Sequence, residues 1–379
     1  MSEGVFIRRE PVVNRQKAIT ASRLILQAQN GAAAAAALND LADVWPKARS
    51  VLVSLGGAFP DEGLLAWQAP ENALLEIPAA GLADAGVQAL LSRIKAAHVP
   101  LCLDGYDPDI EASMAAQFRF LLTDARDYPH VEKGPGLMLA KGLADNGEFD
   151  AAVKNGYAGA VGWFFLHGVA VMNRLNPAHA QIVRVLNLVR RNADIKEVES
   201  ALKHDVTLSF KLLRFINSVG FGLSCEIQSF HHAVSILGYN KLNKWLSLLL
   251  VTASKDASAP ALMQTAIARG RFMELIGQSF FDSAALDNLF ITGTFSLLDI
   301  LLGAQMNIAL EQLNLPEVIN DALLKREGKF APFLELALAC ESDDIVLLER
   351  LAAALHLEAK TVNHAQAEAL AFADALQLN

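Results

Sequence analysis

The stretch from residue 192 to residue 250 limits the fold most, because its apolar residues recur at helical spacing between residues that start and stop helices. Asp194 and Glu197 form a capping pattern ahead of one apolar face. Gly238 ends a later helix and Asn240 caps the one that follows. Further N-cap residues lie between them: Thr207 and Ser229. The stretch predicts four short helices of an all-α bundle.

The motifs of this stretch resemble the HDOD domain of bacterial signalling proteins, an all-helical relative of the HD phosphohydrolases that lacks their metal site. The matching sequences are HDVTLSFKLLRFINS (204–218), FGL (221–223), IQSFHHAVSILGYNKL (227–242) and TGTFSLLDILLG (292–303). Together they cover most of residues 177–340. The resemblance implies an all-α C-terminal domain that functions in signal transduction.

The N-terminal half alternates apolar runs of strand length with alanine-rich helix formers at 31–45 and 86–98. This alternation predicts a parallel sheet in an α/β domain. The connection 124–135 is too short and too broken for a packed helix, so we expect an eroded TIM-barrel-like domain with an incomplete ring of helices. Asn176-Pro177 breaks the chain, which predicts an α/β domain at 1–170 and an all-α domain at 171–379.

Segments of this half resemble the EAL domain, a TIM-barrel-like phosphodiesterase of cyclic di-GMP. ALLEIP (73–78), VPLCLDG (99–105) and LAKGL (139–143) resemble its strands with metal-binding ends. The resemblance implies two divalent metals bound by carboxylates at the carboxyl mouth of the barrel. Several of the family's polar positions carry other residues here: Ser22 for the motif's glutamate, Ser54 for an asparagine, Gly105 for an aspartate, Leu122 for a lysine, Lys141 for a glutamate and Val161 for a glutamine.

Glu76, Asp104 and Asp124 are what remains of that ligand set. They are the candidate ligand-binding residues, yet so few carboxylates do not build a two-metal centre. The alternative interpretation is structural, because a carboxylate at a strand end often caps the next helix or pairs with a nearby arginine. We therefore predict no catalytic residues in this half.

A second candidate metal site lies in the helical half. His204 and Asp205 form an HD dipeptide, and His179 lies upstream, in the order that an HD hydrolase uses to bind metal. Asp205 also precedes the helix that Thr207 caps, where a carboxylate stabilises the helix N-terminus. We favour the structural interpretation and keep the metal site as an alternative.

The formal net charge of −9 argues against nucleic-acid binding, which needs a local excess of lysine and arginine. No apolar run reaches the roughly 18 residues that span a bilayer, and we see no secretion leader. The three cysteines have no CxxC spacing. These features predict a cytoplasmic protein without a cofactor. Apolar faces left by a missing barrel helix suggest a homodimer.

Taken together, the sequence predicts a non-catalytic signal-transduction protein that acts through an unidentified protein partner and is not an enzyme. Two alternatives stay open. One is a sensor that binds cyclic di-GMP or another nucleotide without turnover, and the other is an HD-type metal phosphohydrolase.

Overall fold

The computed structural model describes residues 4–96, 98–131, 136–167, 177–203, 230–251 and 258–376. These residues fall into two compact units. The first comprises those within Met1–Gly168 and Leu338–Ala367, and the second those within Val169–Ala337 and Glu368–Asn379. The division at residue 170 remains a prediction about domains, but a C-terminal segment of the predicted all-α half packs with the N-terminal unit.

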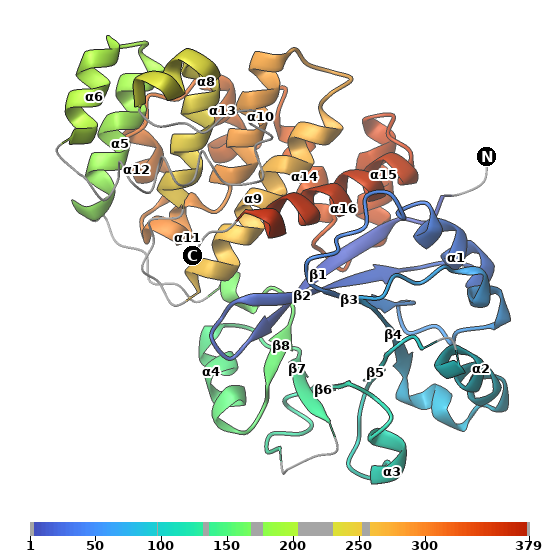
Figure 1. Ribbon diagram of the computed structural model, residues 1–379. Coiled ribbons are helices and arrows are strands. Elements are labelled where there is room, and N and C mark those ends of the chain that lie inside the picture. Colours follow the sequence, from blue (N-terminus) through green and yellow to red (C-terminus); the bar gives the residue numbers. More distant parts are fainter. Residues whose placement is uncertain are drawn as a thin grey trace. The chain divides into compact units, whose positions relative to one another are not determined.

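Eight strands close into a barrel in the order of the sequence, which confirms the predicted TIM-barrel-like fold (Figure 1). From β2 to β8 each strand is parallel to the next one, whereas β1 is antiparallel to both β2 and β8. The strands are β1 Ile7–Asn14, β2 Ile19–Leu26, β3 Ser50–Ser54, β4 Ala73–Pro78, β5 Leu101–Asp104, β6 Phe120–Asp124, β7 Leu137–Lys141 and β8 Gly159–Val161.

A tight turn makes the first strand antiparallel. The Asn14 side-chain oxygen accepts hydrogen bonds from the backbone of Gln16 and Ala18, and Lys17 has a φ of 57°. Because parallel strands need a long crossover, so short a connection forces β1 and β2 into a hairpin. The apolar pattern of β2 is interrupted by Ser22 and Arg23.

The inside of the barrel contains a cluster with one buried apolar side chain from each strand, against which Phe120 also packs. This inner cluster consists of Val12, Ala21, Leu52, Leu74, Cys102, Leu122, Leu139 and Val161, all buried. Side chains alternate between the two faces of a strand, so a residue two positions from a cluster member also points inward. The inner cluster therefore identifies the inward positions at the barrel mouth.

Helices cover only part of the outside of the barrel, as the broken connection predicts. The connecting elements are α1 Gly31–Asn39, η1 Glu62–Ala66, η2 Ala79–Ala83, α2 Ala85–Ala96, α3 Ala112–Ala115, α4 Asn146–Lys154 and η3 Phe164–Leu166. Between β6 and β7, none of the residues that the structure describes is helical. The ring of helices is incomplete there.

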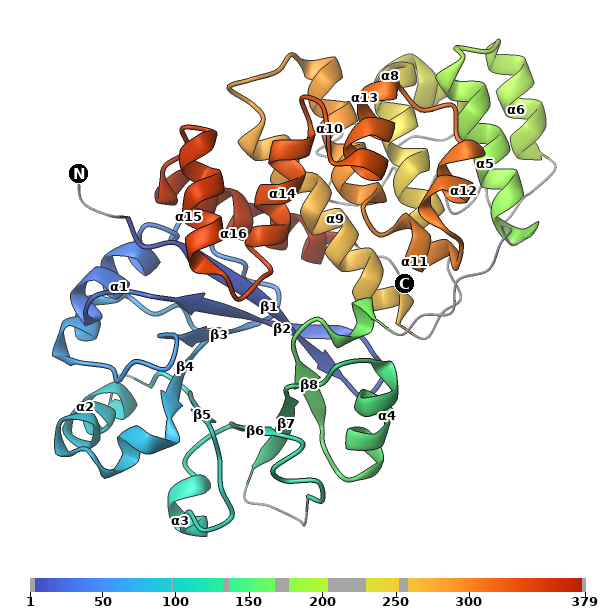
Figure 2. The same ribbon diagram turned by 180° about the vertical axis from the view of Figure 1, so that it is seen from behind.

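The free edge of β1 is covered by the C-terminal segment of the first unit, which contains α15 Ile345–Ala354 and the first part of α16 Ala359–Ala375 (Figure 2). Because β8 is short, it pairs only with Val12–Asn14. The backbone groups of Ile7 and Arg9 instead bond to Asn363, Gln366 and the Cys340 carbonyl.

All elements of the second unit that the structure describes are helices, which confirms the predicted all-α bundle. Asp194 caps α6 by accepting a hydrogen bond from the Lys196 backbone, while Glu197 pairs with Arg191 rather than closing a capping box. The helices here are α5 Pro177–Arg190, α6 Ile195–Lys203, α8 Phe230–Val251, α9 Ala259–Ile276, α10 Ser283–Phe295, α11 Leu298–Leu302, α12 Met306–Glu311, α13 Glu317–Asn320 and α14 Ala331–Ala339, with the π-helical turn η5 Asp321–Lys325.

Gly238 divides α8 as the sequence predicts, with a φ of 70° that favours glycine. Beyond it, Leu242, Trp245, Leu246 and Leu249 are buried on one face. The predicted helix starts at Thr207 and Ser229 lie outside the described residues. None of the described helices combines the length and the apolar character that crossing a membrane requires.

Candidate functional site

The mouth of the barrel carries a ring of polar side chains. Each lies two positions from a member of the inner cluster, toward the carboxyl end of a parallel strand or, on antiparallel β1, toward the amino end. These residues, the mouth ring, are Glu10, Arg23, Ser54, Glu76, Asp104, Asp124 and Lys141. The structure therefore brings all three predicted ligand-binding residues, Glu76, Asp104 and Asp124, to one end of the barrel.

Arg23 binds Glu76 through two parallel hydrogen bonds. Its Nε donates to Glu76 Oε2 at 2.7 Å, and its Nη2 donates to Oε1 at 2.5 Å. Ser54 Oγ donates a third bond to Oε1 at 2.7 Å. Glu76 is only 3% exposed, so this buried carboxylate is fully engaged by the chain's own donors.

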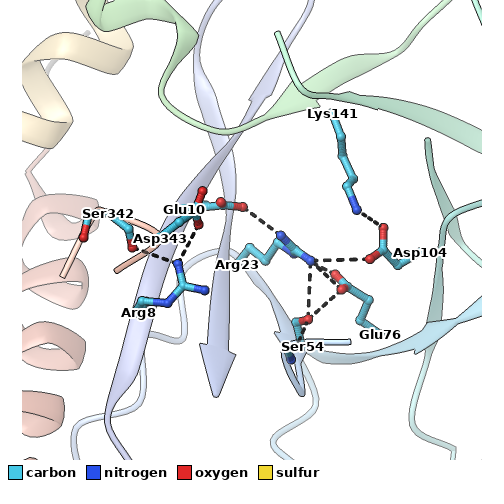
Figure 3. Close-up of polar contacts among 10 residues, drawn as sticks. Arg8, Glu10, Arg23, Ser54, Glu76, Asp104, Lys141, Ser342 and Asp343 are labelled. Atoms are coloured by element: carbon cyan, nitrogen blue, oxygen red, sulfur yellow. Dashed lines mark hydrogen bonds and ion pairs between the residues drawn. The ribbon is translucent and has the colours of Figure 1, made fainter. Parts of the chain in front are cut away.

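The remaining Arg23 donor and Lys141 bind the other carboxylates of the ring (Figure 3). Arg23 Nη1 donates to Glu10 Oε2 at 2.8 Å, and its Nη2 lies 3.8 Å from Asp104 Oδ2. Lys141 Nζ donates to the second oxygen of Asp104. Burial by itself lowers the pKa of Arg23, but hydrogen bonds and charge from Glu76 and Glu10 outweigh it and raise that pKa.

Asp124 belongs to the ring but has a separate partner. Arg126 donates to its two oxygens from Nε at 2.9 Å and from Nη2 at 2.5 Å, and the Arg126 backbone donates at 2.9 Å. The side-chain bonds from Arg126 lower the pKa of Asp124 to about 2 despite some burial. Asp124 is therefore a rim carboxylate paired with an exposed arginine.

We predict that Asp124 stays ionised until the pH approaches 2 and that Arg126→Ala raises its pKa toward the ordinary value of 3.8. Because the folded-state pKa is lowered, this carboxylate contributes stability above its unfolded pKa and loses that contribution as the pH falls toward 2. Carboxyl carbon NMR titration measures the midpoint. An unchanged midpoint in Arg126→Ala would show that Arg126 is not the cause.

Arg23 is not among the candidate residues that the sequence indicates. The resemblance puts Ser22 in the place of the family's glutamate, but Ser22 pairs with Pro11 and Arg23 with Glu10, and the inward position of β2 is Arg23. A shift of one residue moves a side chain to the opposite face of a strand. An arginine inside the buried run ITASRLIL was the available clue, because a buried charge needs a partner.

The mouth ring does not fit a pair of divalent cations in this arrangement. Such a site needs carboxylate oxygens that are free to coordinate metal, and here those of Glu76 and Asp104 bond to Arg23, Ser54 and Lys141. Within the part of the chain that the structure describes, no group of three or more histidine, cysteine or acidic residues could bind a metal ion.

The alternative metal site of the helical half stays a prediction. His179 lies near the start of α5, but its side chain is not among those described. His204 and Asp205 lie outside the described residues.

Comparison with known proteins assigns the helical region. The model of the HDOD domain matches residues 175–305, so the chain carries an HDOD domain there, as the motifs predict. That the barrel belongs to the EAL family is a proposal.

Two curated relatives match about half of the chain. The Vibrio cholerae protein named cyclic di-GMP phosphodiesterase CdgJ is 30% identical over 208 residues, which cover 54% of this chain and 48% of that protein. The Bacillus subtilis protein YuxH is 26% identical over 213 residues, 55% of this chain and 52% of that protein. The chain thus spans about half the length of these relatives.

One solved structure, a Shewanella amazonensis protein provisionally named a phosphohydrolase, matches 55% of this chain and 95% of its own, with 15% identity and a TM-score of 0.39. Such a low score supports no structural argument. The prediction that the chain is not an enzyme is corrected by the name of the Vibrio cholerae relative, because that protein is 30% identical over the matched residues and is named a phosphodiesterase. Hydrolysis is therefore an activity to be tested.

Proposed function

We propose that this chain is a signal-transduction protein whose HDOD domain binds a protein partner and whose barrel is an EAL-like scaffold. The match of residues 175–305 to the HDOD domain carries the proposal. The closed barrel supports the second part, because Glu76, Asp104 and Asp124 lie together at its mouth.

Two exposed apolar side chains of the HDOD domain suggest where a partner binds. Ile236 on α8 is 43% exposed, and so is Phe280 after α9. Large apolar side chains at a protein–protein contact contribute much of the binding energy when they become buried. A variant of one of them is therefore an informative probe of this domain.

We predict that Ile236→Asp reduces recovery of the physiological partner by about tenfold, because a charge must then be buried in the contact. The partner is first identified by proximity labelling with the full-length chain, and its affinity is then measured with purified proteins. Val346→Asp, at a residue that is 68% exposed in the first unit, is the matched control. Equal losses in both variants would contradict a specific role for this HDOD surface.

A second candidate function is hydrolysis of cyclic di-GMP, which the name of the Vibrio cholerae relative favours. The substrate's phosphodiester would be opened by water to give a linear dinucleotide. Incubation of the full-length chain with cyclic di-GMP and Mg²⁺ or Mn²⁺, followed by chromatography, tests this function directly. Product formation that Asp104→Asn abolishes would place the reaction at the barrel mouth.

Calorimetric titration with cyclic di-GMP separates the remaining candidates. Binding without product would support the nucleotide sensor. Absence of both binding and product, together with a partner that Ile236→Asp releases, would support signalling through protein contact alone.

A further inference from the structure

The mouth ring places like charges close together in a partly buried space. Glu10, Glu76 and Asp104 all approach Arg23, and their side chains are 17%, 3% and 17% exposed. Three carboxylates at such proximity repel one another strongly unless cations lie between them. The question is which cations the barrel uses.

Two side chains of the chain itself occupy the space between the carboxylates. The guanidinium of Arg23 contacts all three, and its own side chain is 10% exposed. The ammonium of Lys141, 29% exposed, contacts the other oxygen of Asp104 (Figure 3). Two monovalent cations thus hold a cluster of three carboxylates.

These cations use the same oxygens that a divalent metal would need. Both oxygens of Glu76 accept bonds from Arg23, and the two oxygens of Asp104 face Arg23 and Lys141 respectively. A metal ion would have to displace a buried, bidentate guanidinium, and electrostatic repulsion from both cations would oppose its entry.

We propose that Arg23 and Lys141 are built-in cations that occupy a cation site of the barrel mouth. Glu10, Glu76 and Asp104 do not form a metal site in the present arrangement, and we propose that removal of both cations lets them rearrange into a divalent-cation site. The proposal assigns Arg23 a positioning role for the carboxylates. It does not depend on the proposed function, because it concerns only what holds the mouth ring together.

The test compares Mn²⁺ binding by the full-length wild type and by Arg23→Ala/Lys141→Ala. Electron paramagnetic resonance measures the concentration of free Mn²⁺, and the thermal stability of each variant is measured in parallel. We expect the double variant to bind Mn²⁺ at least tenfold more tightly than the wild type and to gain thermal stability when Mn²⁺ is added. Adding Asp104→Asn to the double variant should abolish both effects. Arg126→Ala, which removes only the rim arginine beside Asp124, is the matched control and should bind no more Mn²⁺ than the wild type.

Two results would overturn the proposal. One is stoichiometric Mn²⁺ binding by the wild type that Asp104→Asn removes, and the other is a folded double variant that binds no Mn²⁺. If the double variant does not fold by itself, refolding it in the presence of Mn²⁺ provides the decision. Mn²⁺ is expected to restore folding of Arg23→Ala/Lys141→Ala but not of the variant that also carries Asp104→Asn, and failure of Mn²⁺ to restore folding overturns the proposal.

Discussion

Arg23→Leu is expected to lower the free energy of unfolding by about 3–5 kcal/mol, the range for removing one partner of a buried ion pair. The substitution leaves Glu76, only 3% exposed, without two of its three side-chain donors. It also removes the cation from Glu10. Urea denaturation followed by circular dichroism measures the loss.

The double variant Arg23→Leu/Glu76→Leu is the control for that result. Because apolar side chains then replace both partners, it should recover much of the lost stability. Arg126→Leu serves as a second control, since Arg126 is largely exposed and its pair with Asp124 should contribute less to stability than the buried pair of Arg23 and Glu76. If Arg23→Leu proved as mild as Arg126→Leu, Arg23 would not organise the mouth.

Asn363→Leu is expected to destabilise the first unit by about 2–4 kcal/mol, because it leaves two backbone groups of the β1 segment unpaired. The Asn363 side chain accepts from the Ile7 N–H at 3.0 Å and donates to the Val5 carbonyl at 2.8 Å. Leucine has similar size but neither polar group. The loss is measured by chemical denaturation.

Amide hydrogen exchange at Ile7 gives the local readout for Asn363→Leu, and protection there should fall with the stability. Thr361→Leu on the same helix is the matched control, because Thr361 is exposed and forms no bond to β1 among the contacts described. Unchanged protection of Ile7 in Asn363→Leu would contradict the role of α16 as a cover for the β1 edge.

Coverage of that edge also affects the oligomer prediction. The sequence suggests a homodimer, because an eroded barrel leaves faces without a helix. Along β1, residues of the same chain bind the free edge. The Arg9 side chain also forms a buried ion pair with Glu341 at 2.6 Å. The oligomeric state stays a prediction, and this edge of β1 is already bonded within the chain.

Helical periodicity allowed much of the helical region to be predicted. Pro177 opens α5, Asp194 caps α6 and Gly238 divides α8, each through a local preference of one residue type. The strand-end carboxylates Glu76 and Asp104 were also placed at the barrel mouth, because the carboxyl ends of parallel strands meet there.

The sequence by itself therefore determined the class of each half: an α/β barrel with a gap in its helices, and an all-α HDOD region. Only the tertiary structure decided which cations face the carboxylates of the mouth and where the C-terminal segment packs. The first depends on strand register, since a shift of one residue exchanges Ser22 for Arg23 at the inward position. The second depends on the shortness of β8, which leaves Ile7 and Arg9 to bond with residues more than 300 positions away in the sequence. Neither follows from local preference, because both partners must first be brought together by the fold.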